Sequence, residues 1–367
     1  MTEILVLGAG EIGEMITAML TGSGDYAVTV GDISAGNLAR IPDGSGVGGR
    51  GVEKLVLDVS DEAALQAALK GKFAVLSAAP YQFTGTIAAA AGQAGVHYLD
   101  LTEDVASTKL VKELAASSPS AFIPQCGLAP GFISIVALDL TRRFDELLDV
   151  HLRVGALPRY PTNALKYNLT WSTDGLINEY IQPCEAIVEG ELREVPALAG
   201  REEFSLDGIR YEAFNTSGGL GTLGETLAGK VRNLNYRTVR YPGHRDLIRL
   251  LTRDLRLGER PDLLKAVFEH ALPRTEQDLV LVFVTVTGKK SGQLVQESYA
   301  RRVFARSLYG RPWTAIQITT ASGICAVLDL LREGRIASSG FVRQEEIDYN
   351  DFISNRFGAN YADPGDD

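Results

Sequence analysis

The first 32 residues constrain the fold of this chain more than any other stretch. An apolar run, residues 3–7, leads directly into Gly8-Ala9-Gly10-Glu11-Ile12-Gly13, which is followed by a helix-like segment, 14–20, and a second apolar run, 26–30, before Asp32. This order predicts a strand, a glycine turn, a helix and a second strand that ends in an acid. Such glycines permit a tight turn, the approach of a pyrophosphate and close helix packing. We therefore expect a dinucleotide-binding turn rather than an ordinary glycine turn.

The residue that follows the second strand indicates which nicotinamide cofactor to expect. Asp32 can accept hydrogen bonds from both ribose hydroxyls and would repel a 2′-phosphate, so the sequence predicts NAD rather than NADP. The phosphates are expected at the helix N-terminus, where backbone N–H groups are free. The predicted cofactor-binding residues are Gly8, Gly10, Glu11, Ile12, Gly13, Asp32, Asp58, Ala79 and Pro80.

Composition excludes several classes of function. The chain has 367 residues and a net charge of −10, with no long basic run, so we expect neither nucleic acid nor a membrane as a partner. The first apolar run is too short for a membrane span and lacks a preceding basic region, so we expect no signal peptide. Three cysteines and four histidines are scattered without metal-ligand spacing. These features predict a cytoplasmic protein without a metal centre.

The distribution of apolar runs predicts two domains. Strands at 54–57, 73–77, 97–101 and 121–124 alternate with helices at 62–69, 86–94 and 109–116, which predicts a Rossmann-type parallel sheet over residues 1–128. A Gly-x-x-Pro-Gly turn at 127–131 and an apolar helix at 133–140 lead into a second, α+β domain, residues 129–315. Its β-like runs, 150–155, 186–188, 210–214, 236–240 and 280–287, predict a mixed or antiparallel sheet. A long helix at 314–331 is expected to return residues 316–367 to the first domain, before a frayed acidic tail at 360–367.

Arg240 and His244 form the sharpest candidate for a substrate site. Arg240 ends a β-like run, where a guanidinium can bind a carboxylate with two hydrogen bonds, and the Pro-Gly turn after it brings His244 close. A histidine with a pKa near 6.5 can accept a proton. The alternatives are a surface ion pair for Arg240 and a packing or helix-capping role for His244.

Four further residues are candidates for the site. Tyr167 and Trp171 lie in a stretch of polar and aromatic residues that suits a substrate mouth, or a strand-to-helix turn capped by Ser172. Lys166 is a candidate base if it loses solvation, and otherwise an exposed amine. Asp100 follows a predicted strand, where it can bind a ribose or a substrate ammonium, or cap the next helix.

A glycine-rich stretch at 218–226 has no P-loop lysine and no strand directly before it. We expect it to be a substrate-side loop, with Gly219 and Thr222 in contact with the amino acid.

The chain resembles the saccharopine dehydrogenase family, and within it the shorter L-lysine 6-dehydrogenase group. The matching stretches are 8–13, 127–131, 167–180, 211–214, 223–226 and 240–244. The resemblance implies a Rossmann domain, a mixed-sheet domain through which the protein dimerises, and oxidation of a C–N bond by NAD(P) to an imine that water opens. Arg240 matches the family arginine that binds a substrate carboxylate. Ala129 stands where glutamate-forming saccharopine dehydrogenases carry an acid, which favours the lysine dehydrogenases.

The resulting prediction is an NAD-dependent L-lysine 6-dehydrogenase, acting as a homodimer or higher homo-oligomer. It would convert lysine to the 6-semialdehyde, which cyclises to a piperideine carboxylate, and ammonia. His244, Lys166 and Asp100 compete as base or ammonium partner, with His244 first. One alternative is a saccharopine dehydrogenase or a related opine or carboxynorspermidine-type reductase, whose second carboxylate anchor Arg274 or Arg311 would supply. Another is a nucleotide-binding regulator without catalysis.

Overall fold

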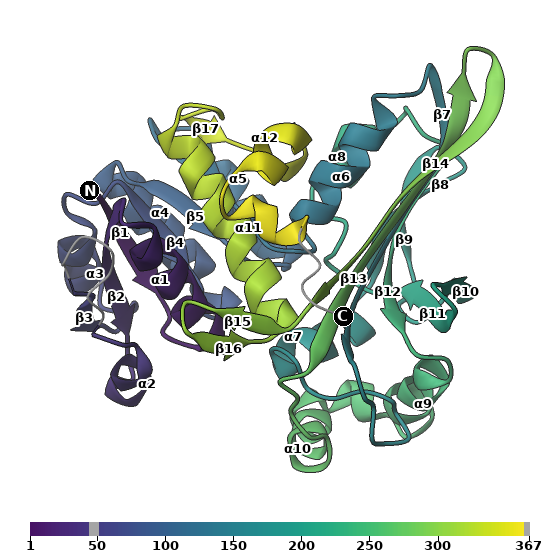
Figure 1. Cartoon of the computed structure of the whole chain (residues 1–367), viewed down its shortest axis with the longest axis horizontal. Helices are drawn as coiled ribbons and strands as arrows, with labels where there is room; N and C mark the ends of the chain where they lie inside the picture. The colour runs from purple at the N-terminus through teal and green to yellow at the C-terminus, as the bar shows by residue number, and fades with distance from the viewer. Residues whose placement is uncertain (44–50, 363–367) are drawn as a thin grey trace. The chain divides into compact units, whose positions relative to one another are not determined.

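The computed structural model describes residues 1–43 and 51–362, and the chain divides into two compact units (Figure 1). The first unit comprises Met1–Phe132, Ser307–Arg311 and Gln317–Ala362, and the second comprises Ile133–Arg306 and Pro312–Ile316. The predicted acidic tail lies outside the described residues from position 363 onward.

The first unit contains a seven-stranded parallel sheet, which confirms the predicted Rossmann-type fold. The strand order is β17-β6-β5-β4-β1-β2-β3. The strands are β1 (Thr2–Leu7), β2 (Tyr26–Asp32), β3 (Glu53–Val56), β4 (Ala74–Ser77), β5 (His97–Asp100), β6 (Ala121–Ile123) and β17 (Gly340–Phe341). The helices are α1 (Glu11–Ser23), α2 (Ala35–Arg40), α3 (Glu62–Leu69), α4 (Thr84–Ala94), α5 (Val105–Ala115), α12 (Tyr349–Ser354) and most of α11 (Ala315–Arg332).

Burial on both faces explains why the central strands of this sheet read as continuous apolar runs. Ile4, Leu5, Val6 and Leu7 of β1 are all 0% exposed. The helices between strands start and stop at expected signals: Asp61 caps α3, and Gly95 ends α4 in the left-handed conformation. These signals are local, so the sequence alone predicts the elements of this unit well.

The C-terminal segment of the first unit is held by one buried carboxylate. Asp329 of α11, which is 1% exposed, accepts hydrogen bonds from Tyr26 of β2 at 2.5 Å, from Asn355 at 2.9 Å and from Arg356 at 2.9 Å. Helix α11 is long and apolar enough to cross a membrane by length and composition, but 83% of it is buried within the fold, as in a core helix.

The second unit is built on an eight-stranded mixed sheet, as predicted. The main path is β10-β11-β12-β7-β13-β14, and β8 pairs with β12 and β9. Among the described strands of this sheet, β12 and β7 pair in parallel and the other pairs are antiparallel. The strands are β7 (Glu146–Pro158), β8 (Cys184–Val188), β9 (Glu191–Val195), β10 (Glu202–Leu206), β11 (Ile209–Asn215), β12 (Asn233–Arg240), β13 (Asp278–Lys290) and β14 (Gln293–Phe304). The helices are α6 (Phe132–Thr141), α7 (Thr173–Ile181), α8 (Leu223–Leu227), α9 (His244–Arg249) and α10 (Pro261–Ala271), and a short pair, β15 (Arg306–Leu308) and β16 (Arg311–Trp313), follows β14.

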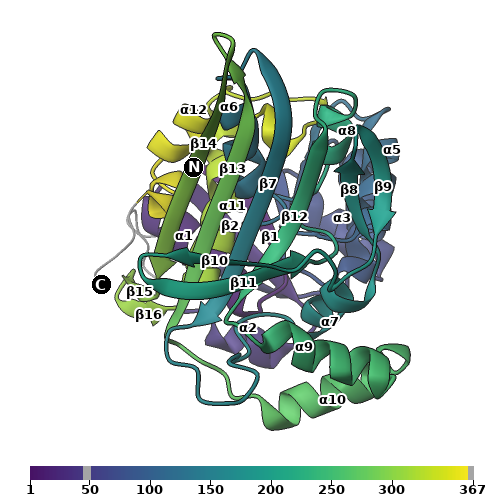
Figure 2. The same cartoon turned by 90° about the vertical axis from the view of Figure 1, so that its right-hand side faces the viewer.

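The sheet contains strands that the sequence did not reveal. In Figure 2 the long strands β14, β13, β7 and β12 lie side by side, and the β10–β11 hairpin crosses in front of them. Strand β14 pairs only with β13 on this path and leaves most of its side chains exposed or half-buried, so it lacks an apolar run. Strand β9 is also almost wholly exposed. Polar strands of this kind are stabilised by pairing rather than by their own side chains, which hides them in the sequence.

Candidate functional site

The turn after β1 contains crowded glycines, Gly8 and Gly13, and an uncrowded one, Gly10. Gly8 has φ +97°, and a Cβ there would lie 2.6 Å from the carbonyl oxygen of Ala78. A Cβ at Gly13 would lie 1.8 Å from the carbonyl oxygen of Gly8. Both glycines are therefore required by the packing of the turn itself. At Gly10 a Cβ would meet nothing within 4 Å, so this glycine leaves open space at the start of α1.

That open space faces free backbone donors. Gly10 is the N-cap of α1, and no side chain caps the helix. The first N–H groups of a helix carry partial positive charge and bind phosphate without a cap. The turn therefore fits the pyrophosphate of a dinucleotide, with Gly10, Glu11 and Ile12 nearest the N-terminus of α1. Glu11 is exposed and Ile12 is half-buried.

Asp32 lies at the end of β2, beside the turn. Its carboxylate accepts the backbone N–H of Ala9 at 2.7 Å and that of Ser34 at 2.7 Å, and Asn37 donates to it at 3.4 Å. These bonds fix its orientation, and the side chain remains partly exposed. A held, accessible carboxylate at this position suits the ribose hydroxyls of a cofactor.

The other predicted cofactor residues follow neighbouring strands. Ala79 and Pro80 follow β4, which pairs with β1, and Asp58 follows β3, which pairs with β2. All these strands are parallel, so their carboxyl ends lie at one edge of the sheet. Asp58 is exposed, and hydrogen bonds from the Ser60 hydroxyl and backbone lower its pKa.

Asp100 lies at the end of β5, where its carboxylate already accepts hydrogen bonds from other groups of the protein. It is 2% exposed and accepts the Tyr98 hydroxyl at 2.8 Å, the Gln125 N–H at 2.9 Å and the Thr102 N–H at 3.0 Å. Burial raises its pKa to about 6, against the effect of these bonds. The alternative that Asp100 caps the next helix is wrong, because Asp104 is the N-cap of α5.

Glu103, three residues after Asp100, is a titratable group that no sequence motif indicated. Loss of solvation, followed by the charge of Asp104, raises its pKa to about 7. Beyond its own backbone, it has no hydrogen-bond or ion-pair partner in the part of the chain that the structure describes. Its exposure and environment follow from the folded loop after β5, and no local sequence pattern marks them.

In the second unit, Arg240 is the centre of a buried polar cluster. It is the last residue of β12 and is 2% exposed. Its Nε donates to the Tyr180 hydroxyl at 3.0 Å, its Nη1 donates to the Val239 carbonyl at 2.8 Å, and its guanidinium carbon lies 4.9 Å from the centre of the Tyr167 ring. Within residues 1–43 and 51–362 no carboxylate lies within ion-pair distance of it. The alternative of a surface ion pair is therefore wrong.

The strand pairing explains why Arg240 lacks a carboxylate. Glu212 is directly opposite Arg240 in the β11–β12 register and is 0% exposed. Its carboxylate is already bound by Arg201 at 2.9 Å and by the backbone N–H of Arg245 at 2.7 Å. A buried guanidinium without a carboxylate is unfavourable unless a ligand supplies one. The charge and burial of Arg240 thus fit the binding of an anionic ligand group.

His244, the first residue of α9, continues the cluster. Its Nδ1 lies 2.8 Å from the Leu165 carbonyl, which can only accept, so Nδ1 carries the proton. Its Nε2 then accepts the Tyr180 hydroxyl at 3.0 Å. The side chain is 1% exposed, and burial, followed by the charge of Arg240, lowers its pKa to about 3. The neutral imidazole therefore orients Tyr180, which in turn meets Arg240.

The structure brings together Arg240, His244 and Tyr167 from the predicted set, and adds Tyr180. The Tyr167 and His244 ring centres are 5.4 Å apart. Tyr180 was missed because its role depends on α7 meeting β12, 60 residues later in the chain. Trp171 is half-buried and packs against the hydrophobic core cluster that contains Tyr167 and Tyr180.

The remaining predicted residues lie in different surroundings. Lys166 is exposed, and its Nζ donates to the Pro242 carbonyl at 3.0 Å, so the loss of solvation that would make it a base is not found. A Cβ at Gly219 would lie 2.2 Å from the Tyr236 ring, so this glycine is required for packing. Thr222 is 7% exposed at the N-cap of α8.

Comparisons with known proteins agree with this architecture. Residues 4–121 match the family model described as the saccharopine dehydrogenase NADP binding domain, and residues 127–359 match the saccharopine dehydrogenase C-terminal domain. The apo, histidine-tagged, L-glutamate-forming saccharopine dehydrogenase of Saccharomyces cerevisiae shares the fold at a TM-score of 0.79 with 15% identity, over 98% of each chain. The homospermidine synthase of Legionella pneumophila, solved in complex with NAD, gives a TM-score of 0.69 with 13% identity, over 98% of this chain and 89% of that one.

A curated relative matches only in part. The mitochondrial alpha-aminoadipic semialdehyde synthase of Mus musculus is 21% identical over 200 residues, which are 53% of this chain and 21% of that protein. The chain therefore spans about a fifth of the length of this relative. The two family models together cover most of the chain, and the Gly127–Gly131 turn lies at the start of the second one. The chain belongs to the saccharopine dehydrogenase family.

Proposed function

We propose that this chain is an NAD-dependent dehydrogenase that oxidises the C–N bond of a basic amino acid, with L-lysine as the substrate and the 6-semialdehyde and ammonia as products. The observation that carries this proposal is Arg240, a buried guanidinium with no carboxylate partner among the described residues. Such a group is suited to bind the α-carboxylate of an amino acid by charge-assisted hydrogen bonds. A fixed carboxylate determines which carbon of the substrate is presented for reaction.

NAD is the proposed cofactor, and the turn after β1 is its proposed site. Gly10 leaves room for the pyrophosphate, and Asp32 would accept the ribose hydroxyls and disfavour a 2′-phosphate. When bound, the nicotinamide supplies the hydride acceptor. The protein contributes binding and orientation through these residues.

The side chains around Arg240 have distinct proposed roles. Tyr167 and Tyr180 cover the guanidinium and limit access of water, which strengthens its attraction for a carboxylate. His244, neutral and bonded at both ring nitrogens, acts as a positioning residue for Tyr180. Its low pKa makes it a poor base near neutral pH.

A substrate amine must lose a proton before its carbon can release a hydride. Among the predicted acceptors, Lys166 is exposed and Asp100 already accepts three hydrogen bonds. Glu103 has a pKa of about 7 and follows β5 at the sheet edge where ligands of parallel sheets bind. A base with a pKa near the working pH is the most efficient, and we assign proton acceptance to Glu103.

A second candidate, saccharopine as the substrate, requires a further carboxylate anchor. Arg311, one of the two arginines predicted for this role, is already paired with Glu14 at 2.5 Å. This pairing favours the lysine reaction. The homodimer and the cytoplasmic location remain predictions.

The test is an absorbance assay of NADH formation at alkaline pH with L-lysine, saccharopine and 1,5-diaminopentane as separate substrates, each with NAD and with NADP. Turnover of lysine with NAD, without any keto acid, is the expected result. Activity with saccharopine alone would overturn the substrate assignment. Tight NAD binding without turnover of any amine would indicate a nucleotide-binding regulator instead.

A further inference from the structure

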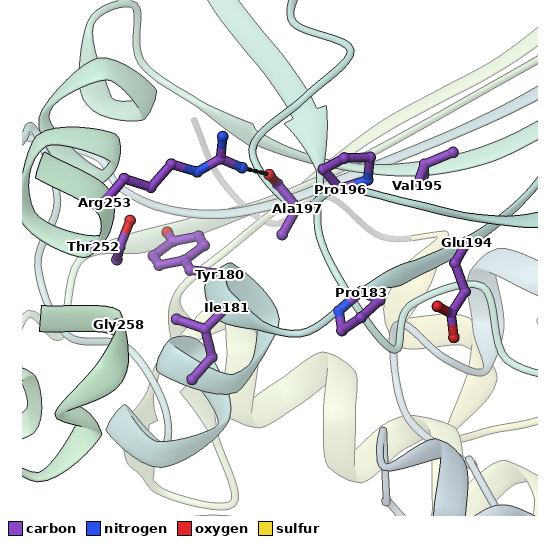
Figure 3. A pocket seen from close by; sticks show the side chains of 10 residues that line it. All are labelled: Tyr180, Ile181, Pro183, Glu194, Val195, Pro196, Ala197, Thr252, Arg253 and Gly258. Atoms are coloured by element: carbon purple, nitrogen blue, oxygen red, sulfur yellow. Dashed lines mark hydrogen bonds between the residues drawn. The ribbon is translucent and has the colours of Figure 1, made fainter. Parts of the chain in front are cut away.

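The second unit contains a pocket of about 440 Å³ that shares only Tyr180 with the proposed substrate-binding residues (Figure 3). Its wall is formed by the end of α7, the segment around β9, and a π-helical turn at Leu250–Asp254. The volume lies within the range of pockets that bind small molecules. The lining residues are Tyr180, Ile181, Pro183, Glu194, Val195, Pro196, Ala197, Thr252, Arg253 and Gly258.

Two opposite charges lie on opposite sides of this pocket. Figure 3 shows Arg253 on one side and Glu194 on the other. Arg253 donates one hydrogen bond, from Nη2 to the Ala197 carbonyl at 2.9 Å, and the described part of the chain offers it no carboxylate within ion-pair distance. Glu194 likewise has no ion-pair or side-chain hydrogen-bond partner within the described ranges. Both charges are therefore available to a ligand.

The surface between the two charges is apolar. Ile181, Pro183, Val195 and Pro196 supply aliphatic side chains to the wall. A complementary ligand therefore carries a carboxylate at one end, an ammonium at the other and a methylene chain between them. A carboxylate would bind Arg253 and an ammonium would bind Glu194 through charge-assisted hydrogen bonds.

The backbone that carries Arg253 has an uncommon conformation. The π-helical turn at Leu250–Asp254 is of a kind that is rare in proteins and frequent at functional sites. Gly258 packs against this turn, because a Cβ there would lie 2.9 Å from the Thr252 carbonyl oxygen. The Thr252 hydroxyl is bonded to the Ile248 carbonyl at 2.8 Å, which holds the turn in place. The packing of Gly258 and the hydrogen bond of Thr252 thus hold this part of the pocket wall in place.

We propose that this pocket is a second binding site, which takes a linear ω-amino carboxylate and regulates the enzyme. Tyr180 provides the connection to the reaction. Its ring lines the pocket, while its hydroxyl accepts from Arg240 and donates to His244. An occupant that shifts this ring changes the position of the Arg240 guanidinium, and so changes the KM for the substrate.

The proposal is tested by isothermal titration calorimetry of the full chain with 4-aminobutyrate, 5-aminopentanoate and 6-aminohexanoate. One chain length should bind best, and hexanoate and hexylamine, which lack one charge each, should bind about tenfold more weakly or worse. Arg253→Ala and Glu194→Gln should each weaken the best ligand by about tenfold or more. Arg249→Ala is the matched control, because this arginine is exposed on α9 and does not line the pocket.

Three results would overturn the proposal. The first is that no ω-amino carboxylate binds to the wild type, and the second is that Arg253→Ala and Glu194→Gln bind the best ligand with unchanged affinity. The third is that Arg240→Lys alone loses affinity, which would place the ligand at Arg240. Kinetics give a second measure that does not depend on the fold of one variant. The best ligand should change the substrate KM of the wild type and of Arg249→Ala, but not that of Arg253→Ala. A failure of the proposed reaction leaves the calorimetric result unaffected, so the two proposals are tested separately.

Discussion

Replacing Arg240 by methionine separates a ligand-binding role from a structural one. Methionine keeps an unbranched side chain of similar length in the buried space but removes the charge. Arg240 is 2% exposed and donates only to the Tyr180 hydroxyl and the Val239 carbonyl in the described structure. Glu179 attracts the Arg240 charge and the Tyr167 and Tyr180 rings face it, but no carboxylate is paired with it. Removing a buried charge that has no ion-pair partner relieves a penalty of a few kcal/mol. The two lost hydrogen bonds cost about 1 kcal/mol each.

The expected free energy of unfolding of the ligand-free variant is therefore equal to or above that of the wild type. Catalysis should change in the opposite direction. A substrate carboxylate that enters the site without Arg240 is left buried and unpaired, at a cost of about 3–5 kcal/mol. At about 1.4 kcal/mol for each factor of ten, kcat/KM should fall by a factor on the order of 100 to 3,000, mainly through a higher KM.

Arg153→Met is the matched control. Arg153 of β7 is also buried, at 7% exposed, but it is paired with Glu202 of β10 at 2.5 Å and donates to Thr285 at 3.0 Å. Its removal leaves Glu202 with one fewer partner and should lower the unfolding free energy by about 3 kcal/mol, with KM unchanged. Urea unfolding and steady-state kinetics measure both quantities. If Arg240→Met lost as much stability as Arg153→Met and kept its KM, Arg240 would be a structural residue and not the residue that binds the substrate carboxylate.

Four further predictions concern the first unit and the histidine. Gly10→Ala should fold with a stability within about 1 kcal/mol of the wild type but lose cofactor affinity. Gly13→Ala should instead be destabilised by about 1–3 kcal/mol, because its Cβ would clash with a backbone carbonyl of the same turn. Equal cofactor affinity in Gly10→Ala and the wild type, measured by fluorescence titration, would contradict the pyrophosphate site. Asp32→Asn should reduce the preference for NAD over NADP by about tenfold, and an unchanged ratio of the two dissociation constants would count against the NAD assignment. The kcat/KM of the wild type should rise as the pH increases through about 7, the pKa of Glu103. In Glu103→Gln this rise should be absent. A rise near pH 7 that persists in the variant would belong to the titration of another group. Folding lowers the pKa of His244 from 6.5 to about 3, so between these two pH values the unfolded state binds one more proton than the folded state. The free energy of unfolding of the wild type, relative to that of His244→Gln, should therefore fall as the pH falls from 6 to 4, by on the order of 1 kcal/mol per pH unit. Parallel plots of unfolding free energy against pH for the two proteins would show that His244 is not buried in its neutral form.

The elements of the first unit were predictable because their signals are local. Residues 3–7 form one continuous apolar run, and the strand is buried on both faces, which is the environment that such a run predicts. The glycine spacing after it specifies the turn directly. The second unit gave weaker signals, since β14 is an edge strand of the main path in which Gln293, Gln296 and Arg301 are exposed. Pairing with β13 defines that strand, and no pattern within residues 293–304 records the pairing.

The candidate site shows the same limit more sharply. The sequence indicated Arg240 and His244 as residue types at the end of a strand, but it could not indicate their protonation or their partners. His244 was expected to titrate near pH 6.5, and burial beside Arg240 instead lowers its pKa to about 3. Tyr180 joins the two only because α7 and β12 meet in the folded unit. Electrostatics of this kind depend on burial, which a single sequence does not specify.

The residues that the fold does not need are the ones that indicate ligands. Gly8 and Gly13 are explained by backbone carbonyls of the protein itself, whereas the space at Gly10 is open. Arg153 is explained by Glu202, whereas Arg240 has no such counterpart in the described chain. In each pair the residue types are identical, and only the surroundings separate a structural role from a binding role. A glycine without a crowding neighbour and a buried arginine without a carboxylate each lower the stability of the empty protein, and binding of a pyrophosphate or a carboxylate removes that disadvantage.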